Sequence, residues 1–268
     1  MADAPSTLNV VFPEIYLGTI ENQENDCNSS GAGVKNDKET GRKTKYASMT
    51  DDERIKYINT TMDTYLTDGT LKQAVADGYV LVERTTESGV RLGIVGLIDL
   101  DDYDFDPKKK TLIRATEGTV ISRIPPRVKI RENAAIELPH VMLLVDDPID
   151  RQKIDGCQGA TQEDAVNIAA VKHGIIEYVY AIRDTLRKLY DTELMQEGGH
   201  IRGYAVEGEA AKQVTEAFAA KQESSRGFLF AVGDGNHSLA TAKTCWENIK
   251  KSGKFTEEQL KTHPARHA

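Results

Sequence analysis

The chain has 268 residues, of which 39% are apolar and 28% are charged, so it is long enough to bury a core and has the composition of a globular protein. It carries 34 basic and 42 acidic residues, and the net charge of −8 disfavours broad binding to nucleic acid or to an anionic membrane. The length excludes a short peptide as the class of molecule, and the charge balance still allows a small anionic substrate.

The sequence shows no recognisable signal for secretion or membrane insertion. The N-terminal residues lack the layout of a signal peptide, and no apolar run approaches the ~18 residues of a membrane helix. Cys27, Cys157 and Cys245 are widely spaced and form no CxxC pair. We therefore predict a cytoplasmic protein with reduced thiols. A homodimer stays open as an assembly, because symmetric dimers are common.

The composition along the chain predicts three parts. Residues 1–20 form an N-terminal arm, in which Pro13 permits an edge strand or an extended segment but no central strand. Residues 21–48 are polar and rich in Gly, Asn and Lys, which is typical of a flexible insertion. Residues 49–268 are expected to form a single α+β domain.

Strand and helix patterns are interspersed in this domain, which predicts a mixed β-sheet with flanking helices. Thr50 followed by Glu53 is typical of a capped helix N-terminus. Pro125-Pro126 predicts an extended backbone. The other expected elements are a hairpin over residues 79–100, a buried strand over 141–148, the longest helix over 165–189, a strand over 198–206, a helix over 207–222, and a strand over 228–232 that leads into a last helix.

The last strand and helix are joined by a glycine-rich turn, Gly233-Asp234-Gly235-Asn236-His237-Ser238. A helix that begins after such a turn presents unpaired N–H groups at the positive end of its dipole, where phosphate commonly binds. Asp234 is a candidate for binding Mg²⁺ or orienting a hydroxyl, and His237 for a phosphate contact or proton transfer. Because the turn matches neither GxxxxGK[ST] nor GxGxxG, an ordinary capped helix start is the alternative.

A group of cations lies within a short stretch of this acidic chain, at Arg114, Arg123, Arg127, Lys129 and Arg131. Guanidinium groups bind phosphate through two parallel hydrogen bonds, so the group indicates contacts with a polyanion. A solvated face that nearby glutamates neutralise is the alternative.

Two further groups of polar residues suit chemistry. Two glycines precede His200 and Arg202, which permits close approach of a ligand to the backbone. His200, His237 and Asp234 together are a candidate metal site, although no local ligand spacing supports it. Asp146-Asp147 ends a predicted strand and suits either a metal or hydroxyl ligand or a turn.

The segments RATEGTVISRIPPRVKIRENAAIELPHVMLLVDDP, GGHIRGY and FAVGDGNHSLATAK resemble the bacterial and protist branch of the uncharacterised family called domain of unknown function 1015. The resemblance extends from ADAPSTLNVVFPEIYL to the C-terminus, apart from the polar insertion. Members of this family usually continue at both ends, so the chain is expected to be a fragment whose domain is incomplete at its C-terminus.

A wider signature of this family, Asp-Gly-His-His-Arg, resembles the phosphate-contacting motif of ParB-type nucleotide hydrolases, sulfiredoxin and free serine kinases. Asp234 and Gly235 match it, Asn236 and His237 take the two His positions, and Ser238 replaces the Arg. The resemblance implies a ParB/sulfiredoxin-like core that binds a nucleotide phosphate.

This resemblance implies a phosphotransferase or nucleotide hydrolase that uses ATP or ADP with Mg²⁺, in which catalysis is positioning and charge neutralisation. The resemblance gives Asp234 the role of binding Mg²⁺ or orienting a hydroxyl, and it gives His237 the phosphate contact. Chemical reasoning alone makes Glu117 the candidate general base. A non-catalytic nucleotide- or metabolite-binding module and a metal-dependent hydrolase are the alternatives. The other candidate contacts to the nucleotide are Gly233, Gly235, Asn236, Ser238, Arg114, Arg127, Arg202 and Lys243.

Overall fold

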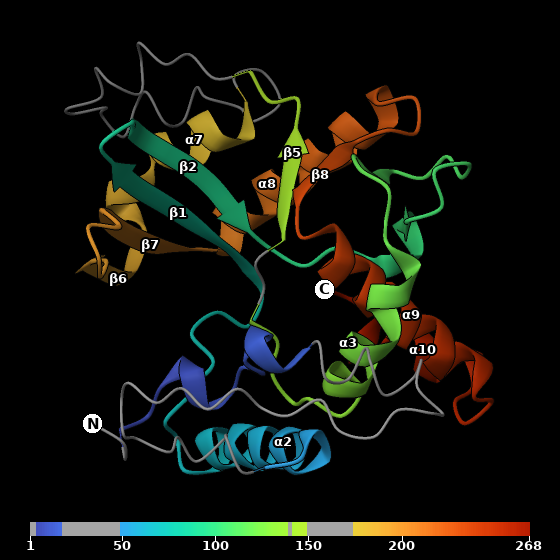
Figure 1. Cartoon of the computed structure of the whole chain (residues 1–268). Coiled ribbons are helices and arrows are strands. Elements are labelled where there is room, and N and C mark those ends of the chain that lie inside the picture. The colour runs from blue at the N-terminus through green and yellow to red at the C-terminus, as the bar shows by residue number, and fades with distance from the viewer. Residues whose placement is uncertain (1–3, 18–48, 139–140, 149–173) are drawn as a thin grey trace. The chain divides into compact units, whose positions relative to one another are not determined.

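The computed structural model describes residues 4–17, 49–138, 141–148 and 174–268 (Figure 1). The chain divides into two compact units, each assembled from separate stretches of sequence. Unit 1 comprises Met1–Lys72, Glu117–Val141 and Gly235–Arg266, and unit 2 comprises Gln73–Thr116, Met142–Asp234 and His267–Ala268. Residues 49–268, predicted as one domain, thus contain segments of both units. The predicted insertion over residues 21–48 lies outside the described residues.

Unit 1 is built from helices and short 3₁₀ turns. Within it, α3 packs against α9. Its helices are α2 (Asp51–Thr67), α3 (Ile124–Arg131), α9 (Asn236–Lys251) and α10 (Glu257–Lys261), and its 3₁₀ turns are η1 (Thr7–Asn9), η2 (Glu14–Tyr16), η4 (Ile121–Arg123) and η6 (Pro264–Arg266).

The predicted start of α2 is confirmed. The Thr50 side chain accepts the Glu53 N–H, and the Glu53 carboxylate accepts the Thr50 N–H at 2.7 Å, which forms a capping box. Ile58 and Met62 of this helix pack with apolar residues of the N-terminal arm. The arm itself contains η1 and η2 in place of the predicted strand or extended segment, because Ser6 caps a local turn by accepting the Leu8 N–H.

The prediction of an extended backbone at Pro125-Pro126 is wrong. These prolines occupy the first turn of α3, where the N–H that proline lacks would have no partner within the helix. The fixed φ of proline also suits a helix start. Ile124 and Pro126 are buried, so the same prolines that appeared to hold the chain extended instead begin a packed helix.

In the part of the chain that the structure describes, unit 2 contains two four-stranded sheets. The first has the order β2-β1-β7-β6 and is antiparallel throughout. The second has the order β3-β4-β8-β5, with β3, β4 and β8 parallel and β5 antiparallel. The strands are β1 (Gly78–Thr86), β2 (Gly89–Val95), β3 (Tyr103–Asp104), β4 (Ile113–Ala115), β5 (Met142–Val145), β6 (Arg187–Glu193), β7 (His200–Glu207) and β8 (Phe230–Asp234).

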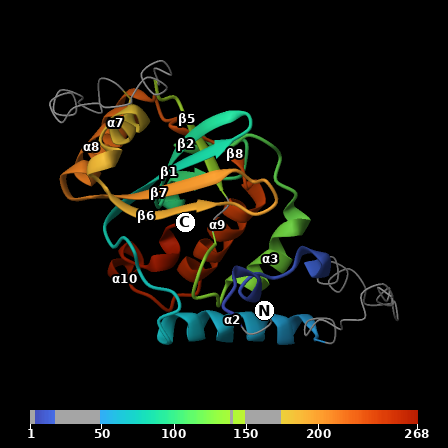
Figure 2. The same cartoon turned by 90° about the vertical axis from the view of Figure 1, so that its left-hand side faces the viewer.

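Helices α7 (Ile175–Ala181) and α8 (Gly208–Ser224) cover one face of the first sheet (Figure 2). Leu81 of β1 and Tyr204 of β7 face each other in register and are buried against both helices. Burial of side chains such as Leu81 and Val179, which have no exposed surface, contributes about 1.5–3 kcal/mol each. The predicted hairpin, the strand over residues 198–206 and the helix over 207–222 are confirmed.

The predicted helix over residues 165–189 is corrected in its second half. Residues 165–173 lie outside the described residues, α7 ends at Ala181, and a 3₁₀ turn η5 (Arg183–Thr185) leads into β6. Apolar residues at helical spacing did extend to Leu186 in the sequence. Pairing with β7 takes precedence over that spacing, because β6 gains backbone hydrogen bonds along the edge of the sheet on both sides of a bulge between Lys188 and Tyr190.

The strand predicted over residues 141–148 is present as β5 but is not buried. It lies at an edge of the second sheet, and Met142 and Leu144 are 52% and 53% exposed. A continuous apolar run is typical of a central strand, but it does not reveal whether a second neighbour is present. Sheets of mixed direction together with separate helices confirm the α+β class.

Candidate functional site

The N-terminus of α9 in unit 1 is the part of the predicted site that the structure describes most fully. Its N-cap is Gly235, whose φ of 85° lies in the left-handed region, and no side chain of the described residues caps the helix. The first N–H groups of any helix have no partner within it. The predicted strand, glycine turn and helix are thus confirmed, with Gly233 and Asp234 as the end of β8 in unit 2 and Asn236 as the first residue of α9.

The left-handed backbone conformation at position 235 favours glycine over any residue with a Cβ. A residue with a Cβ in the left-handed region costs about 1–2 kcal/mol. We therefore predict that Gly235→Ala lowers the free energy of unfolding by about that amount, as measured by urea denaturation. Gly118→Ala is the matched control, because a Cβ at Gly118 would meet no atom within 4 Å. Equal stability of the two variants would contradict the prediction.

A short segment, Glu117–Val120, is held against the first turn of α9 by two hydrogen bonds. Asn236 donates from Nδ2 to the Glu117 carboxylate at 3.3 Å, and the Val120 N–H donates to His237 Nε2 at 3.2 Å. The second bond assigns the proton of the neutral His237 imidazole to Nδ1. The structure thus brings together three of the predicted site residues, Glu117, Asn236 and His237.

The side-chain amide of Asn236 donates a hydrogen bond but accepts none from the described residues. The residue is 3% exposed, and its Oδ1 is buried with no hydrogen-bond partner among the described residues. Exchanging the amide oxygen and nitrogen would set Oδ1 against the Glu117 carboxylate, so the orientation is determined by that contact. A buried unsatisfied polar atom costs about 1–3 kcal/mol, and such atoms call for an explanation. Thr119 Oγ1, within the same segment, is also buried and unpartnered among these residues.

The other predicted contacts in unit 1 have protein partners. Lys243 is 7% exposed and forms an ion pair with Glu247 at 2.9 Å. Arg127 on α3 donates to the carbonyl of Arg123 at 3.0 Å. Ser238 lies in the first turn of α9. Lys243, predicted as a nucleotide contact, is therefore held near the middle of α9.

In unit 2, the predicted nucleotide contacts Arg114 and Arg202 also bind protein groups. Arg114 donates to the carbonyls of Thr111 and Gly227, both at 3.0 Å, and stacks over Phe228. Arg202 pairs with the buried carboxylate of Glu83 at 2.7 Å. These contacts give both guanidinium groups a structural role.

Arg202 and His200 share a second carboxylate. Asp191 lies 3.3 Å from Arg202 Nε and 3.0 Å from His200 Nε2. A hydrogen bond from Lys188 lowers the pKa of Asp191, so this carboxylate stays ionised at neutral pH. His200 therefore lies beside the Asp191 carboxylate on the paired strands β6 and β7. The described residues contain no group of three or more His, Cys, Asp or Glu side chains that could hold a metal.

Asp147, an open candidate for a metal or hydroxyl ligand, caps α7. Its carboxylate accepts the N–H groups of Ile175 and Ile176 at 2.9 and 3.0 Å, and Lys221 lies 3.3 Å away. These contacts stabilise the positive end of the helix dipole. Ile175, Ile176 and Lys221 are distant from Asp147 in the sequence, so no local pattern predicted that Asp147 would contact them.

Sequence reasoning did not include Thr119 or the Val120 N–H among the site groups. Thr119 lies two residues after the predicted site residue Glu117, and this proximity in the sequence is the signal that could have identified it. Cys245, on the inner face of α9, has a thiol pKa raised by burial, so it stays protonated at neutral pH and is a poor nucleophile.

The described residues thus define an α+β protein with an uncapped helix N-terminus beside a carboxylate. A family model described as "Protein of unknown function (DUF1015)" matches residues 38–268, and the chain belongs to this family. Searches with the chain found no match among curated proteins or solved structures. None of the described helices is sufficiently long and apolar to span a bilayer.

Proposed function

We propose that the protein binds a nucleotide phosphate at the first turn of α9 and transfers a phosphoryl group to or from a small molecule. The observation that carries this proposal is the buried Asn236 amide, whose oxygen has no partner among the described residues. It lies at a helix start that no side chain in the described part of the chain caps. A missing ligand accounts for both features at once.

The phosphate would bind the N–H groups at the start of α9, where the helix dipole favours negative charge. Gly235 supports this because it has no side chain to obstruct close approach. The His237 imidazole, with Nε2 occupied by Val120, can donate from Nδ1. An ordinary helix start would show the same backbone, but it would leave the Asn236 oxygen unexplained.

Asn236 Oδ1 accepts hydrogen bonds, so a phosphate oxygen, which is also an acceptor, would not satisfy it. A ligand partner for it would be a hydroxyl, an amino group or a cation, and the first turn of α9 would have to move to admit that partner, because the oxygen is buried. A nucleotide with Mg²⁺ supplies each of these, and oxygen ligands suit Mg²⁺. Asp234, which precedes Gly235 in the chain, is the carboxylate that we propose for Mg²⁺.

Glu117 is the proposed general base. Its carboxylate is exposed, and the hydrogen bond from Asn236 sets it beside the start of α9. A base there could accept the proton of an attacking hydroxyl while the helix N–H groups hold the phosphoryl oxygens. Phosphoryl transfer depends largely on positioning and charge neutralisation. In this proposal the helix N–H groups and Glu117 supply the positioning, and Mg²⁺ supplies the charge neutralisation.

The proposal predicts that ATP or ADP with Mg²⁺ stabilises the protein. At about 100 times Kd the gain is about 2.7 kcal/mol, which raises Tm by roughly 5–10 °C in a chain of this size. Asn236→Ala and His237→Ala should remove most of this rise. Asn248→Ala, on the exposed side of the same helix, is the matched control and should retain it. No rise with any nucleotide, or equal rises in Asn236→Ala and Asn248→Ala, would refute the proposal.

A binding module without turnover is the second candidate, because Ser238 occupies the position where the family signature has an Arg. Glu117→Gln separates the two candidates. In a phosphotransferase it should reduce turnover of the nucleotide by about 10²-fold or more with affinity within a few-fold. Nucleotide binding with no turnover in the unaltered protein would favour the module.

A further inference from the structure

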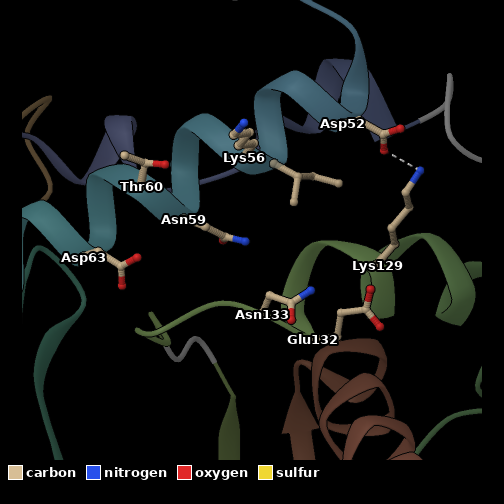
Figure 3. A pocket seen from close by; sticks show the side chains of 9 residues that line it. Asp52, Lys56, Asn59, Thr60, Asp63, Lys129, Glu132 and Asn133 are labelled. Carbon is tan, nitrogen blue, oxygen red and sulfur yellow. Dashed lines mark ion pairs between the residues drawn. The ribbon is translucent and has the colours of Figure 1, made fainter.

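The cations predicted to contact a polyanion are only partly neutralised in unit 1. Lys129 forms an ion pair with Asp52 at 2.7 Å (Figure 3), and Arg131 forms one with Glu137. Arg123 is exposed, and its guanidinium forms no ion pair or hydrogen bond within the part of the chain that the structure describes. The N–H donors of this guanidinium are therefore available to a ligand.

Two successive hydrogen bonds connect Arg123 to the first turn of α9. The Val120 N–H donates to His237 Nε2 at 3.2 Å, and the Arg123 N–H donates to the Val120 carbonyl at 3.1 Å. These contacts set the backbone of η4 beside the start of α9, and α3, which follows Arg123, packs on α9 (Figure 1). The long Arg123 side chain thus begins one 3₁₀ turn away from a residue that contacts His237.

The charge of Arg123 is unfavourable at its position in α3. Arg123 is the N-cap of this helix, and the first turn contains no acidic residue. The N-terminus is the positive end of the helix dipole, where an anion is favourable and a cation is not. Arg127 lies four residues further on and donates to the Arg123 carbonyl at 3.0 Å, and like charges at this spacing repel each other. An anion bound at Arg123 would offset both effects.

We propose that Arg123 binds a phosphate group of the ligand at the first turn of α9. A guanidinium presents planar N–H donors that match phosphate oxygens through two parallel hydrogen bonds. Arg114, Arg202 and Lys243, which were predicted for such contacts, bind protein groups instead. The inference rests on the proposed function, because Arg123 holds the same phosphate-bearing ligand and adds to the neutralisation of its charge.

The test is a calorimetric titration of the whole chain with ADP and with ATP, each with Mg²⁺, at low salt because added salt screens such contacts. Arg123→Gln should weaken nucleotide binding at least about tenfold, since a hydrogen bond between charged groups is lost. Arg123→Lys keeps the charge without the planar fork, so it should recover part of the affinity. Arg91→Gln, which removes an exposed arginine of β2 in unit 2, is the matched control and should bind as the unaltered chain does.

The thermal stability of the ligand-free variants separates ligand binding from a role in the fold. Arg123→Gln removes a cation from the positive end of α3, so its Tm should equal or exceed that of the unaltered chain. Circular dichroism measures this Tm. A Tm below those of the unaltered chain and of Arg91→Gln would show that Arg123 stabilises unit 1, and it would overturn the inference.

The titrations also distinguish a failure of this inference from a failure of the proposed function. If the unaltered chain binds neither ADP nor ATP, both are overturned. If the unaltered chain binds a nucleotide and Arg123→Gln binds it with equal affinity, the role of Arg123 alone is overturned. The expected result is a loss of affinity in Arg123→Gln and partial recovery in Arg123→Lys, without any loss of Tm.

Discussion

Arg202→Met should lower the free energy of unfolding by about 2–3 kcal/mol. The change leaves the Glu83 carboxylate, 7% exposed, without the guanidinium that lies 2.7 Å from it. Removing one partner of a buried pair usually costs more, but Arg202 is itself partly solvated, which reduces the loss. Urea denaturation followed by circular dichroism measures the effect.

The double variant Glu83→Gln, Arg202→Met should recover part of this loss, because it leaves no unpaired buried charge. Glu83 and Arg202 are directly opposite each other on β1 and β7, so the cycle reports on a single cross-strand contact. A stability change below about 0.5 kcal/mol in Arg202→Met would contradict the structural role. That result would favour the predicted role of Arg202 as a nucleotide contact.

Trp246→Ala should lower the free energy of unfolding by about 3–5 kcal/mol. Trp246 is 1% exposed on the inner face of α9, and its ring lies 5.8 Å from that of His263. Truncation leaves a large cavity in unit 1, which holds the α9 site. Because Trp246 is the only tryptophan, circular dichroism must replace fluorescence as the measurement.

Trp246→Phe is the control, since it keeps an aromatic ring and should lose less than half as much stability. Trp246→Ala should also weaken nucleotide binding, because the N-terminus of α9 depends on the packing of the rest of that helix. A loss below about 1 kcal/mol would show that unit 1 repacks around the gap and would contradict this account.

Local sequence signals predicted the elements whose stabilising contacts are local. Thr50 and Glu53 are three residues apart, so the capping box needs nothing beyond one turn of α2. The β1–β2 hairpin likewise follows from neighbouring strands and a short turn. Pro125-Pro126 misled because proline suits both an extended segment and a helix start. Only packing of α3 on α9 selects between them.

The α9 site shows the same division. The glycine turn and the residues Asn236 and His237 could be predicted from the strand and helix that flank them. Their contacts with Glu117 and Val120 could not, because 119 and 117 residues separate the partners. The positive charge of Arg114 and Arg202 predicted contacts with phosphate. In the structure Arg114 donates to backbone carbonyls and Arg202 pairs with the Glu83 carboxylate. Gly227 and Glu83 are more than 100 residues away in the sequence, so no local pattern indicated these contacts.

The sequence by itself thus determined the α+β class, the helix starts, the hairpin and the glycine turn, since these depend on side-chain periodicity and on backbone contacts within a few residues. Only the tertiary structure decided that β5 lies at a sheet edge, that residues 187–193 form a strand and that Asn236 is buried with an unsatisfied oxygen. Each of these features depends on which segments, distant in the sequence, become neighbours in the folded chain. The contacts between such segments stabilise the fold only after packing, so no local sequence pattern predicts them.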